Sequence, residues 1–461
     1  MQNDVKFPIY SGASPKEIFE DLKPLVNFQS KGVSLENLKQ IIKERLEPHL
    51  MKYNHPGFLS MFNEFPEEGA KFGAEIALKF NQGVTDWHVS PGGAMLEELC
   101  IKSLCNLFGL SDNSDGTFMY SGTYANQEAL YLALHWKAEQ EGFDLAKEGL
   151  RGFDNPDRLI ILTSIDAHFS LKHAIRMLGL GEKNLHTLEV DGNRRIDIEK
   201  MHKTVEEKQK EYDVFCVVAT AGTTSTGSID PVLPIAEICK NLKIWLHVDG
   251  AYGLAYSLIP KHKKKFSGIE LADSVSWDPH KQFGTPIPNS VLFLSNKEEF
   301  NRMALRSDYL YQEGDIILSP GLKSPPSTRP FSALPLVTSI LYQGMDKIIE
   351  KLSSPLNAIS LLYEKLKRDS DIVLCNKPET GILCFRVKSE KSQENQMNNF
   401  QQQIYNKVNS KGSHSISLTK LGEKVVLRLV AVSPTKVETL MKTISYVKEI
   451  ARKIAFSGES K

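Results

Sequence analysis

The sequence predicts an α/β protein with a large, mostly parallel sheet and a smaller α/β lobe at the C-terminus. Three apolar runs, residues 158–163, 214–220 and 243–248, are typical of buried strands. Helical patterns separate the runs, as at residues 235–241, and alternation of strand and helix is typical of parallel α/β sheets. Small and polar residues follow each run, at the strand ends where such sheets bind ligands.

The N-terminal part has helical spacing. Apolar residues recur at this spacing through residues 14–50, and Ser14 and Ser34 stand where N-caps are expected. This pair of helices has too little mass to fold alone. We therefore expect residues 1–75 to form a helical segment that packs on something larger.

The rest of the chain divides into a large domain, residues 76–335, and a C-terminal small domain, residues 336–461. In the small domain, strands are expected at residues 381–387 and 424–432, and a closing amphipathic helix at 435–454. The polar, Gln- and Asn-rich residues 389–409 are expected to form an exposed loop or helix.

Composition argues against several classes of partner. The chain has 461 residues, with 56 Lys plus Arg against 56 Asp plus Glu, so nothing points to nucleic acid or an anionic membrane. The lysine cluster at residues 261–265 is expected to be a solvated loop. The first ten residues lack the apolar core of a signal peptide, and no apolar run approaches a membrane span. We expect a cytoplasmic protein without a membrane partner.

The six cysteines are scattered and form no CxxC pair. Cys216, Cys239 and Cys384 stand inside apolar runs. Buried free thiols in a reducing compartment are the expected state.

Two segments that lie close in the sequence carry the chemistry. Lys281 follows His280 just after an apolar run, and Asp249 ends the run 243–248. A lysine in a pocket can form a Schiff base, and pyridoxal phosphate (PLP) needs a lysine for its aldehyde and an acid near its ring nitrogen. An isolated Pro-His-Lys is usually a surface loop, but together the two segments indicate a PLP site.

A third segment can bind the phosphate. Ser121, Gly122 and Thr123 precede a strong helical pattern from Asn126 to Trp136. Backbone N–H groups at a helix start, with small residues giving access, bind anions. The same three residue types also cap helices that bind nothing. The prediction of a phosphate site here therefore depends on the lysine and aspartate segments that follow in the sequence.

Together these segments resemble the group II PLP-dependent amino-acid decarboxylases, which include glutamate, cysteine sulfinate, aromatic amino acid and diaminobutyrate decarboxylases. The resemblance covers most of the chain and is strongest from Ser90 to Arg329. It implies fold type I, the PLP-dependent transferase-like fold. It also implies a homodimer across which the N-terminal segment packs.

The resemblance implies catalytic roles for Lys281, Asp249 and His168. His168 matches the histidine that stacks on the ring face near the reacting carbon. Thr223 and Thr224 match a turn at the ring edge, and Ala251, two residues past Asp249, would pack under the opposite face.

Asp278 and His280 match positions that contribute to phosphate binding. Asparagine is often found where this chain has Asp278. A carboxylate at that position would repel a phosphate unless a cation or water intervened, so His280 is the stronger of the two assignments.

Three positions resemble the substrate side of the family's site. Arg428 alternates with apolar residues and matches the arginine that grips the substrate carboxylate, although most such arginines form a structural ion pair. Phe58 belongs to a His-Pro-Gly-Phe sequence that resembles a substrate-side segment, and His88 stands among aromatic residues that can line a substrate wall.

The implied activity is decarboxylation of an L-amino acid to a primary amine and CO2. An acidic substrate (glutamate-, aspartate- or cysteine-sulfinate-like) is favoured slightly over an aromatic one. In the family, a tyrosine on a mobile loop protonates the substrate carbon after CO2 leaves. Residues 314–329 contain no tyrosine, and Tyr309 and Tyr311 precede the expected loop tip. An aldehyde-forming oxidative reaction is therefore the alternative outcome.

Two other interpretations stay open. His168, His247, Asp249 and His280 are the rival constellation for a metal site, although the sequence has no HExxH motif. A non-catalytic homologue is the second alternative, and the presence of Lys281, Asp249 and His168 together argues against it.

Overall fold

The computed structural model describes residues 8–28, 30–305, 319–389 and 393–458. Contacts divide the chain into two compact units. The larger unit consists of residues 62–357 and 376–381, and the smaller unit of residues 1–61, 358–375 and 382–461.

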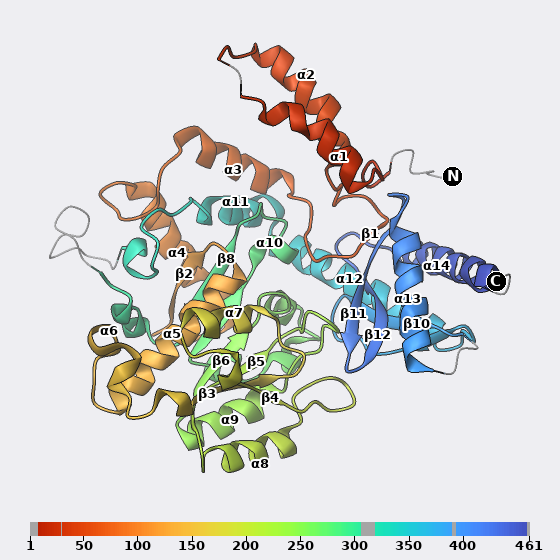
Figure 1. Ribbon diagram of the computed structural model, residues 1–461. Helices are drawn as coiled ribbons and strands as arrows, with labels where there is room; N and C mark the ends of the chain where they lie inside the picture. The colour runs from red at the N-terminus through yellow and green to blue at the C-terminus, as the bar shows by residue number, and fades with distance from the viewer. Residues whose placement is uncertain (1–7, 29, 306–318, 390–392, 459–461) are drawn as a thin grey trace. The chain divides into compact units, whose positions relative to one another are not determined.

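The larger unit is built on a seven-stranded sheet of order β2-β8-β7-β6-β5-β3-β4 (Figure 1). Every neighbouring pair is parallel except the two pairs that involve β8. The predicted large, mostly parallel sheet is therefore confirmed. In chain order, its strands are β2 (Asp115–Met119), β3 (Leu159–Ser164), β4 (Leu185–Leu188), β5 (Asp213–Thr220), β6 (Trp245–Asp249), β7 (Ser274–Trp277) and β8 (Ser290–Leu294).

Helices cover this sheet, which explains why its inner strands are apolar throughout. Every residue of β3 and β6 is buried, as expected for strands with helices on both faces. Helix α5 packs across β5 to β8, while α8 and α9 pack on β4, β5 and β6 (Figure 1). The α-helices of the larger unit are α3 (Glu68–Phe80), α4 (Pro91–Phe108), α5 (Gly122–Gln140), α6 (Leu145–Glu148), α7 (Ser170–Met177), α8 (Ile198–Lys208), α9 (Val232–Leu242), α10 (Pro279–Gln282) and α11 (Ala333–Gln343).

The smaller unit contains a five-stranded sheet of order β1-β11-β12-β10-β9. Its pairs are antiparallel except β1 with β11. The core between this sheet and its helices includes the end of α12 (Met345–Leu366), together with α13 (Glu394–Asn409) and α14 (Val437–Gly458). The predicted C-terminal α/β lobe is thus confirmed. Its strands are β1 (Phe58–Leu59), β9 (Ile372–Leu374), β10 (Ile382–Val387), β11 (Ser415–Leu421) and β12 (Lys424–Val430).

Helix α13 corrects one expectation. Residues 389–409 were expected to be exposed because they are rich in Gln and Asn, but Phe400, Ile404 and Val408 of α13 are buried. These residues recur every four positions, so they line one face of the helix. Gln401 is also buried, because its side chain donates to and accepts from the backbone of Val387 at 2.8 and 3.0 Å.

The N-terminal helices form as predicted. Helices α1 (Pro15–Leu22) and α2 (Leu35–Arg45) begin after Ser14 and Ser34, whose hydroxyls accept backbone N–H groups at 3.3 and 3.2 Å. Neither helix has a buried residue, so both present apolar side chains at the surface.

The six cysteines are free, and five of them are buried while Cys375 is half-buried. Burial raises the pKa of the Cys100 thiol to about 12, which keeps it protonated. No helix within the described residues has the length and apolar character needed to cross a membrane.

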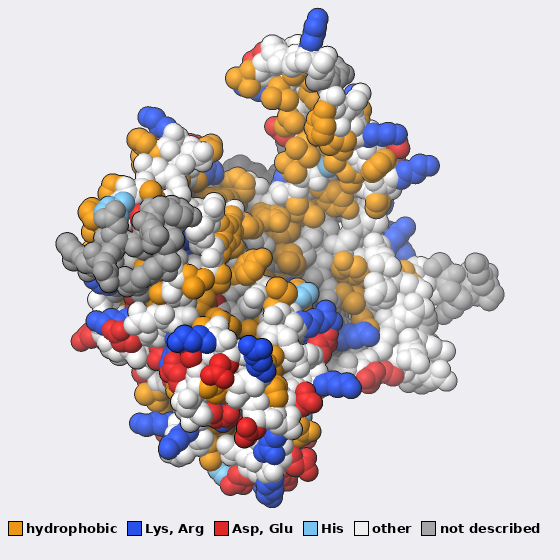
Figure 2. Space-filling model, turned by 60° about the vertical axis from the view of Figure 1, so that its left-hand side comes forward, with side chains coloured by type: hydrophobic (Ala, Val, Ile, Leu, Met, Phe, Trp, Pro, Cys, Tyr) orange, Lys and Arg blue, Asp and Glu red, His pale blue; other side chains and the backbone are white. Residues whose placement is uncertain are grey.

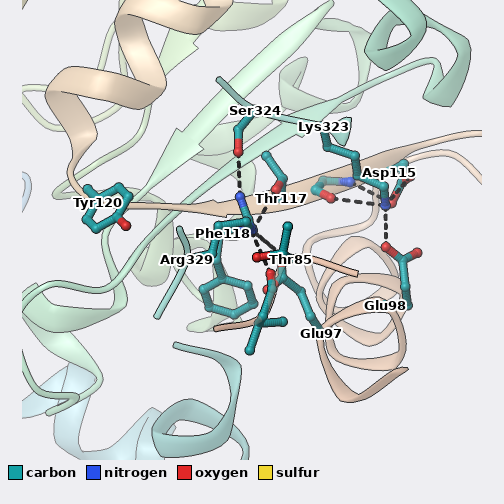
Figure 3. Close-up of polar contacts among 12 residues, drawn as sticks. Thr85, Glu97, Glu98, Asp115, Thr117, Phe118, Tyr120, Lys323, Ser324 and Arg329 are labelled. Atoms are coloured by element: carbon teal, nitrogen blue, oxygen red, sulfur yellow. Dashed lines mark hydrogen bonds and ion pairs between the residues drawn. The ribbon is translucent and has the colours of Figure 1, made fainter. Parts of the chain in front are cut away.

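Buried ion pairs tie α4 and β2 to the segment that precedes α11. The Lys323 side chain is 1% exposed, and its amine lies 2.5 Å from a Glu98 oxygen and 2.7 Å from an Asp115 oxygen (Figure 3). The Arg329 guanidinium pairs with Glu97 and donates to Thr117 at 3.0 Å. These contacts connect parts of the chain more than 200 residues apart.

We predict that Lys323→Met destabilises the protein, because it leaves the carboxylates of Glu98 and Asp115 buried without their cation. The free energy of unfolding in urea should fall by about 3 kcal/mol. The control is Lys200→Met, since the Lys200–Glu189 pair is exposed, at 53% and 72%, and its loss should change stability by less than about 1 kcal/mol. An equal, small effect of both variants would contradict the prediction.

Candidate active site

One cavity of the larger unit gathers most of the residues singled out in the sequence. It has a volume of about 130 Å³ and lies where β5, β6 and β7 end and α5 begins. Of the predicted cofactor-binding residues, only Thr223 is missing from its wall. The lining residues are Ser121, Gly122, Thr123, Asn126, His168, Ser170, Thr220, Gly222, Thr224, Asp249, Ala251, Tyr252, Asp278, His280 and Lys281.

Asp249 is the last residue of β6 and is 6% exposed. Its carboxylate accepts hydrogen bonds from the Asn126 amide at 2.9 Å and from the Ala251 backbone N–H at 3.1 Å. Burial opposes ionisation, but attraction to His168 when that ring is protonated, the charge of Lys281 and the Asn126 hydrogen bond outweigh it and hold the pKa of Asp249 below its ordinary value. Asp249 is therefore an ionised acid at a buried strand end.

Lys281 is placed by the short helix α10, which follows β7 directly. Its amine lies 2.9 Å from a carboxylate oxygen of Asp278 and 5.7 Å from the centre of the Phe62 ring. The lysine thus stands at the cavity wall with an acidic partner and an apolar neighbour.

His168 lies in the loop between β3 and α7. Its Nδ1 accepts the backbone N–H of Ser170 at 3.3 Å, and its ring packs against Phe169 with centroids 4.1 Å apart. Burial lowers the pKa of His168 despite the attraction of Asp249. A neutral imidazole therefore faces the cavity near neutral pH.

The start of α5 forms the anion-binding side of the cavity. Ser121 is the N-cap, and its hydroxyl accepts the backbone N–H of Tyr124 at 3.3 Å. Space there is limited, because a Cβ on Gly122 would come within 2.9 Å of an Asp278 oxygen and 3.3 Å of the Ala251 Cβ. Glycine at this position lets a ligand approach the backbone N–H groups, as a phosphate site requires.

Asp278 and His280 stand next to this helix start. The His280 Nδ1 lies 2.6 Å from the Asn289 carbonyl oxygen, and burial lowers the pKa of His280. Asp278 is 3% exposed, and its second carboxylate oxygen has no hydrogen-bond partner among the described residues. The carboxylate at this place is thus paired mainly with Lys281.

Thr223 lies in the turn after β5, but its hydroxyl is used within that turn. It lies 2.9 Å from the Thr226 hydroxyl and accepts the Ser228 backbone N–H at 3.1 Å. The neighbouring Thr224 lines the cavity instead. A contact of the Thr223 side chain with a cofactor stays a prediction that this geometry does not favour.

The three predicted substrate residues do not line the cavity. His88 belongs to the larger unit, where its ring packs on Trp87 at 4.2 Å between centroids. Phe58 and Arg428 belong to the smaller unit. Phe58 stacks on Tyr53 at 4.7 Å, and Arg428 donates to the Ser417 hydroxyl at 2.8 Å and to the Ser60 carbonyl at 3.0 Å. Their roles toward a substrate stay predictions.

The rival metal constellation does not form a ligand set. Within the described ranges, no three or more His, Cys, Asp or Glu side chains are arranged to hold a metal ion. Both ring nitrogens of His247 are also engaged, with Ser274 at 2.9 Å and Asn126 at 3.0 Å. His247 therefore has no nitrogen to offer a metal.

The residues present fit PLP. A lysine, a buried ionised acid, an imidazole and a helix N-terminus that a Cβ would crowd converge on one cavity. This is the donor set that the aldehyde, ring nitrogen, ring face and phosphate of PLP require. Sequence reasoning missed Asn126 and Ser170, which line the same cavity; the only signal for Asn126 was its place at the helix start.

Comparisons with known proteins show the family of this chain. The pyridoxal-dependent decarboxylase conserved domain matches residues 19–388. An L-2,4-diaminobutyrate decarboxylase of Acinetobacter baumannii is 27% identical over 98% of this chain and 89% of its own. An acidic amino acid decarboxylase of Homo sapiens is 29% identical over 79% of this chain and 70% of its own. The solved structure of Oryza sativa TDC with PLP and tryptamine has a TM-score of 0.89, covers 97% of this chain and 94% of that chain, and is 18% identical.

The match to the family domain covers most of the chain, and the cavity offers the groups that the family's cofactor needs. The chain therefore belongs to the pyridoxal-dependent decarboxylase family and is a PLP-dependent carboxy-lyase.

Proposed function

We propose that the protein converts an L-amino acid into a primary amine and CO2 at the cavity around Lys281. The convergence of Lys281, Asp249, His168 and the α5 N-terminus on one cavity carries this proposal. When bound, PLP supplies an electron sink for the charge left at the substrate carbon as CO2 departs.

Each residue has a distinct task in this proposal. The Lys281 amine would hold the cofactor through its aldehyde carbon, and Asp249 would keep a proton on the ring nitrogen. The N–H groups at the start of α5, with His280, would hold the phosphate. The neutral His168 would pack on the ring face, where its free nitrogen can hold or move a proton near the reacting carbon.

The substrate side chain is proposed to be acidic. The human acidic amino acid decarboxylase supports this choice, whereas the Acinetobacter relative acts on a diamino acid and the rice structure contains an aromatic amine. Arg428 would bind the substrate carboxylate. A panel of acidic, diamino and aromatic amino acids distinguishes these substrate classes.

The product is proposed to be an amine rather than an aldehyde. The candidate proton donors Tyr309 and Tyr311 lie outside the described residues. The aldehyde-forming reaction remains the second candidate because residues 314–329 contain no tyrosine.

We further propose that the protein is a homodimer in which residues 1–75 pack across both subunits. Helices α1 and α2 have no buried residues, yet Phe19, Leu35 and Leu38 are exposed by 63%, 68% and 43%. Figure 2 shows hydrophobic side chains gathered on the protein surface. A second subunit would cover the apolar residues of both helices. A cytoplasmic location also stays a prediction, and the buried free thiols support it.

The absorption spectrum tests directly whether Lys281 holds PLP. Wild-type protein with PLP should show an absorption band at roughly 410–430 nm from lysine-bound cofactor, and Lys281→Ala should lose it. Assays for CO2, amine, aldehyde and peroxide across the substrate panel then identify the product. A wild type that never forms the band would overturn the proposal, and aldehyde with peroxide would establish the alternative reaction.

The second prediction concerns the carboxylate beside the phosphate site. Asp278→Asn removes a negative charge next to the phosphate and releases Lys281 from its ion pair, so PLP should bind roughly tenfold tighter or more. Equilibrium dialysis measures the dissociation constant. Asp273→Asn, which removes a half-buried carboxylate outside the cavity, is the matched control and should leave the dissociation constant unchanged. Weaker binding by Asp278→Asn would show that the carboxylate assists the site.

The third prediction separates two roles of Arg428. If its guanidinium binds the substrate carboxylate, Arg428→Lys should raise KM by roughly tenfold or more while the PLP absorption band stays unchanged. A purely structural arginine would give the opposite pattern, with a lower Tm and an unchanged KM.

A further inference from the structure

A row of buried side chains, called the polar ladder below, lies beneath the cavity on the face of the sheet that α5 covers. Its members are Trp245, His247 and Asp249 of β6 and Ser274 and Ser276 of β7. Trp245, His247 and Asp249 alternate along β6, so their side chains point to one face. The partners of His247 and Asp249 on β7 are Ser274 and Ser276. A parallel strand at the centre of a sheet is normally apolar on both faces, so this polar row requires a reason.

Asn126 of α5 joins the ladder to the cavity. Its side chain is 1% exposed and makes four hydrogen bonds. The amide nitrogen donates to Asp249 at 2.9 Å and to Ser170 at 3.0 Å. The amide oxygen lies 3.0 Å from both the His247 Nε2 and the Ser276 hydroxyl. Every hydrogen-bonding position of the amide is thus used.

The direction of each hydrogen bond in the ladder follows from the residues at the two ends of the chain of bonds, Trp245 and Asn126. The indole N–H of Trp245 can only donate, and it does so to the Ser274 hydroxyl at 3.0 Å. At the other end, the Asn126 oxygen can only accept, so the His247 Nε2 beside it donates, and the Nδ1 of a neutral ring then accepts from the Ser274 hydroxyl at 2.9 Å. Burial lowers the pKa of His247 to about 4, so the ring is neutral and its single N–H is on Nε2. That N–H donates to the Asn126 oxygen.

We propose that Asn126 is a positioning residue that fixes the Asp249 carboxylate and keeps it ionised against burial, through a hydrogen-bond chain that starts at Trp245. The inference rests on the proposed function, because its purpose is to let Asp249 hold a proton on the cofactor ring nitrogen. Turning the amide over would place its oxygen against the Asp249 carboxylate and its NH2 group against the His247 Nε2–H, and both arrangements are repulsive. The amide nitrogen therefore always faces Asp249.

The ladder supports the Asp249 carboxylate without relying on a group whose charge can change. Asp249 is stabilised by His168 when that ring is protonated, by the charge of Lys281, and by Asn126. The Lys281 charge changes when its amine reacts, and the His168 charge changes with pH. The hydrogen bonds from Asn126 and from the Ala251 backbone N–H are independent of both, so they are the constant part of the support for Asp249.

The experiment compares Asn126→Leu with Glu128→Leu. Glu128 lies on the same helix, is 3% exposed, and both its carboxylate oxygens have no hydrogen-bond partner within the described chain. With ¹⁵N-labelled PLP, NMR reports whether the ring nitrogen is protonated as the pH is raised. In Asn126→Leu the nitrogen should lose its proton at a pH about one unit lower than in wild type, and PLP should bind roughly tenfold more weakly. Glu128→Leu should match wild type in both.

Two further measurements keep the test decisive. In the wild type without PLP, ¹⁵N NMR of histidine should show His247 as the Nε2–H form with no titration between pH 5 and 8. The Nδ1–H form, or titration near pH 6.5, would overturn the inference even if the variants fail to fold. Equal ring-nitrogen titration in wild type and Asn126→Leu would also overturn it. A wild type that binds no PLP would instead refute the proposed function.

Discussion

The negative charge of Asp249 at the end of a buried strand is the constraint on which the site depends. A carboxylate that is 6% exposed is costly unless hydrogen bonds and charges replace the water it has lost. The surrounding elements supply these from several directions: Asn126 from α5, the backbone of Ala251, and the charge of Lys281. Several residues around the cavity thus stabilise the Asp249 charge in addition to any contact that they make with a ligand.

The same constraint explains the departures from an ordinary parallel sheet. His247, Ser274 and Ser276 would be apolar in a sheet that served only as a core. They are buried and polar because each holds a neighbour in one orientation, and the chain of bonds ends at Asp249. Outside the cavity, the ion pairs of Lys323 and Arg329 follow a similar rule, because each buried cation has at least one carboxylate within contact.

Much of the fold and the site could be predicted from the sequence, for local reasons. The buried strands β3, β5 and β6 are continuous apolar runs. The hydroxyl residues Ser14 and Ser34 mark the N-caps of α1 and α2. The residues after each strand could be grouped because parallel strands end at one edge. Asn126 was missed because its partners, His247, Asp249 and Ser276, are more than 100 residues away. The sequence could not separate Thr223 from Thr224, because only the folded turn decides which of two adjacent threonines lines the cavity, and Thr224 does so here.

Helix α5 has two separate roles within little more than one turn: its start lies on the anion side of the cavity, and Asn126 orients Asp249. Its first N–H groups face the anion side of the cavity, and Asn126 holds the acid on the other side. The rise from Ser121 to Asn126 is about 7.5 Å at the standard rise of an α-helix. Backbone geometry, which side-chain substitutions leave unchanged, therefore sets the spacing between the two contacts. Because Asn126 holds Asp249 and not the ligand, the helix fixes where the acid stands relative to the N–H groups on the anion side of the cavity.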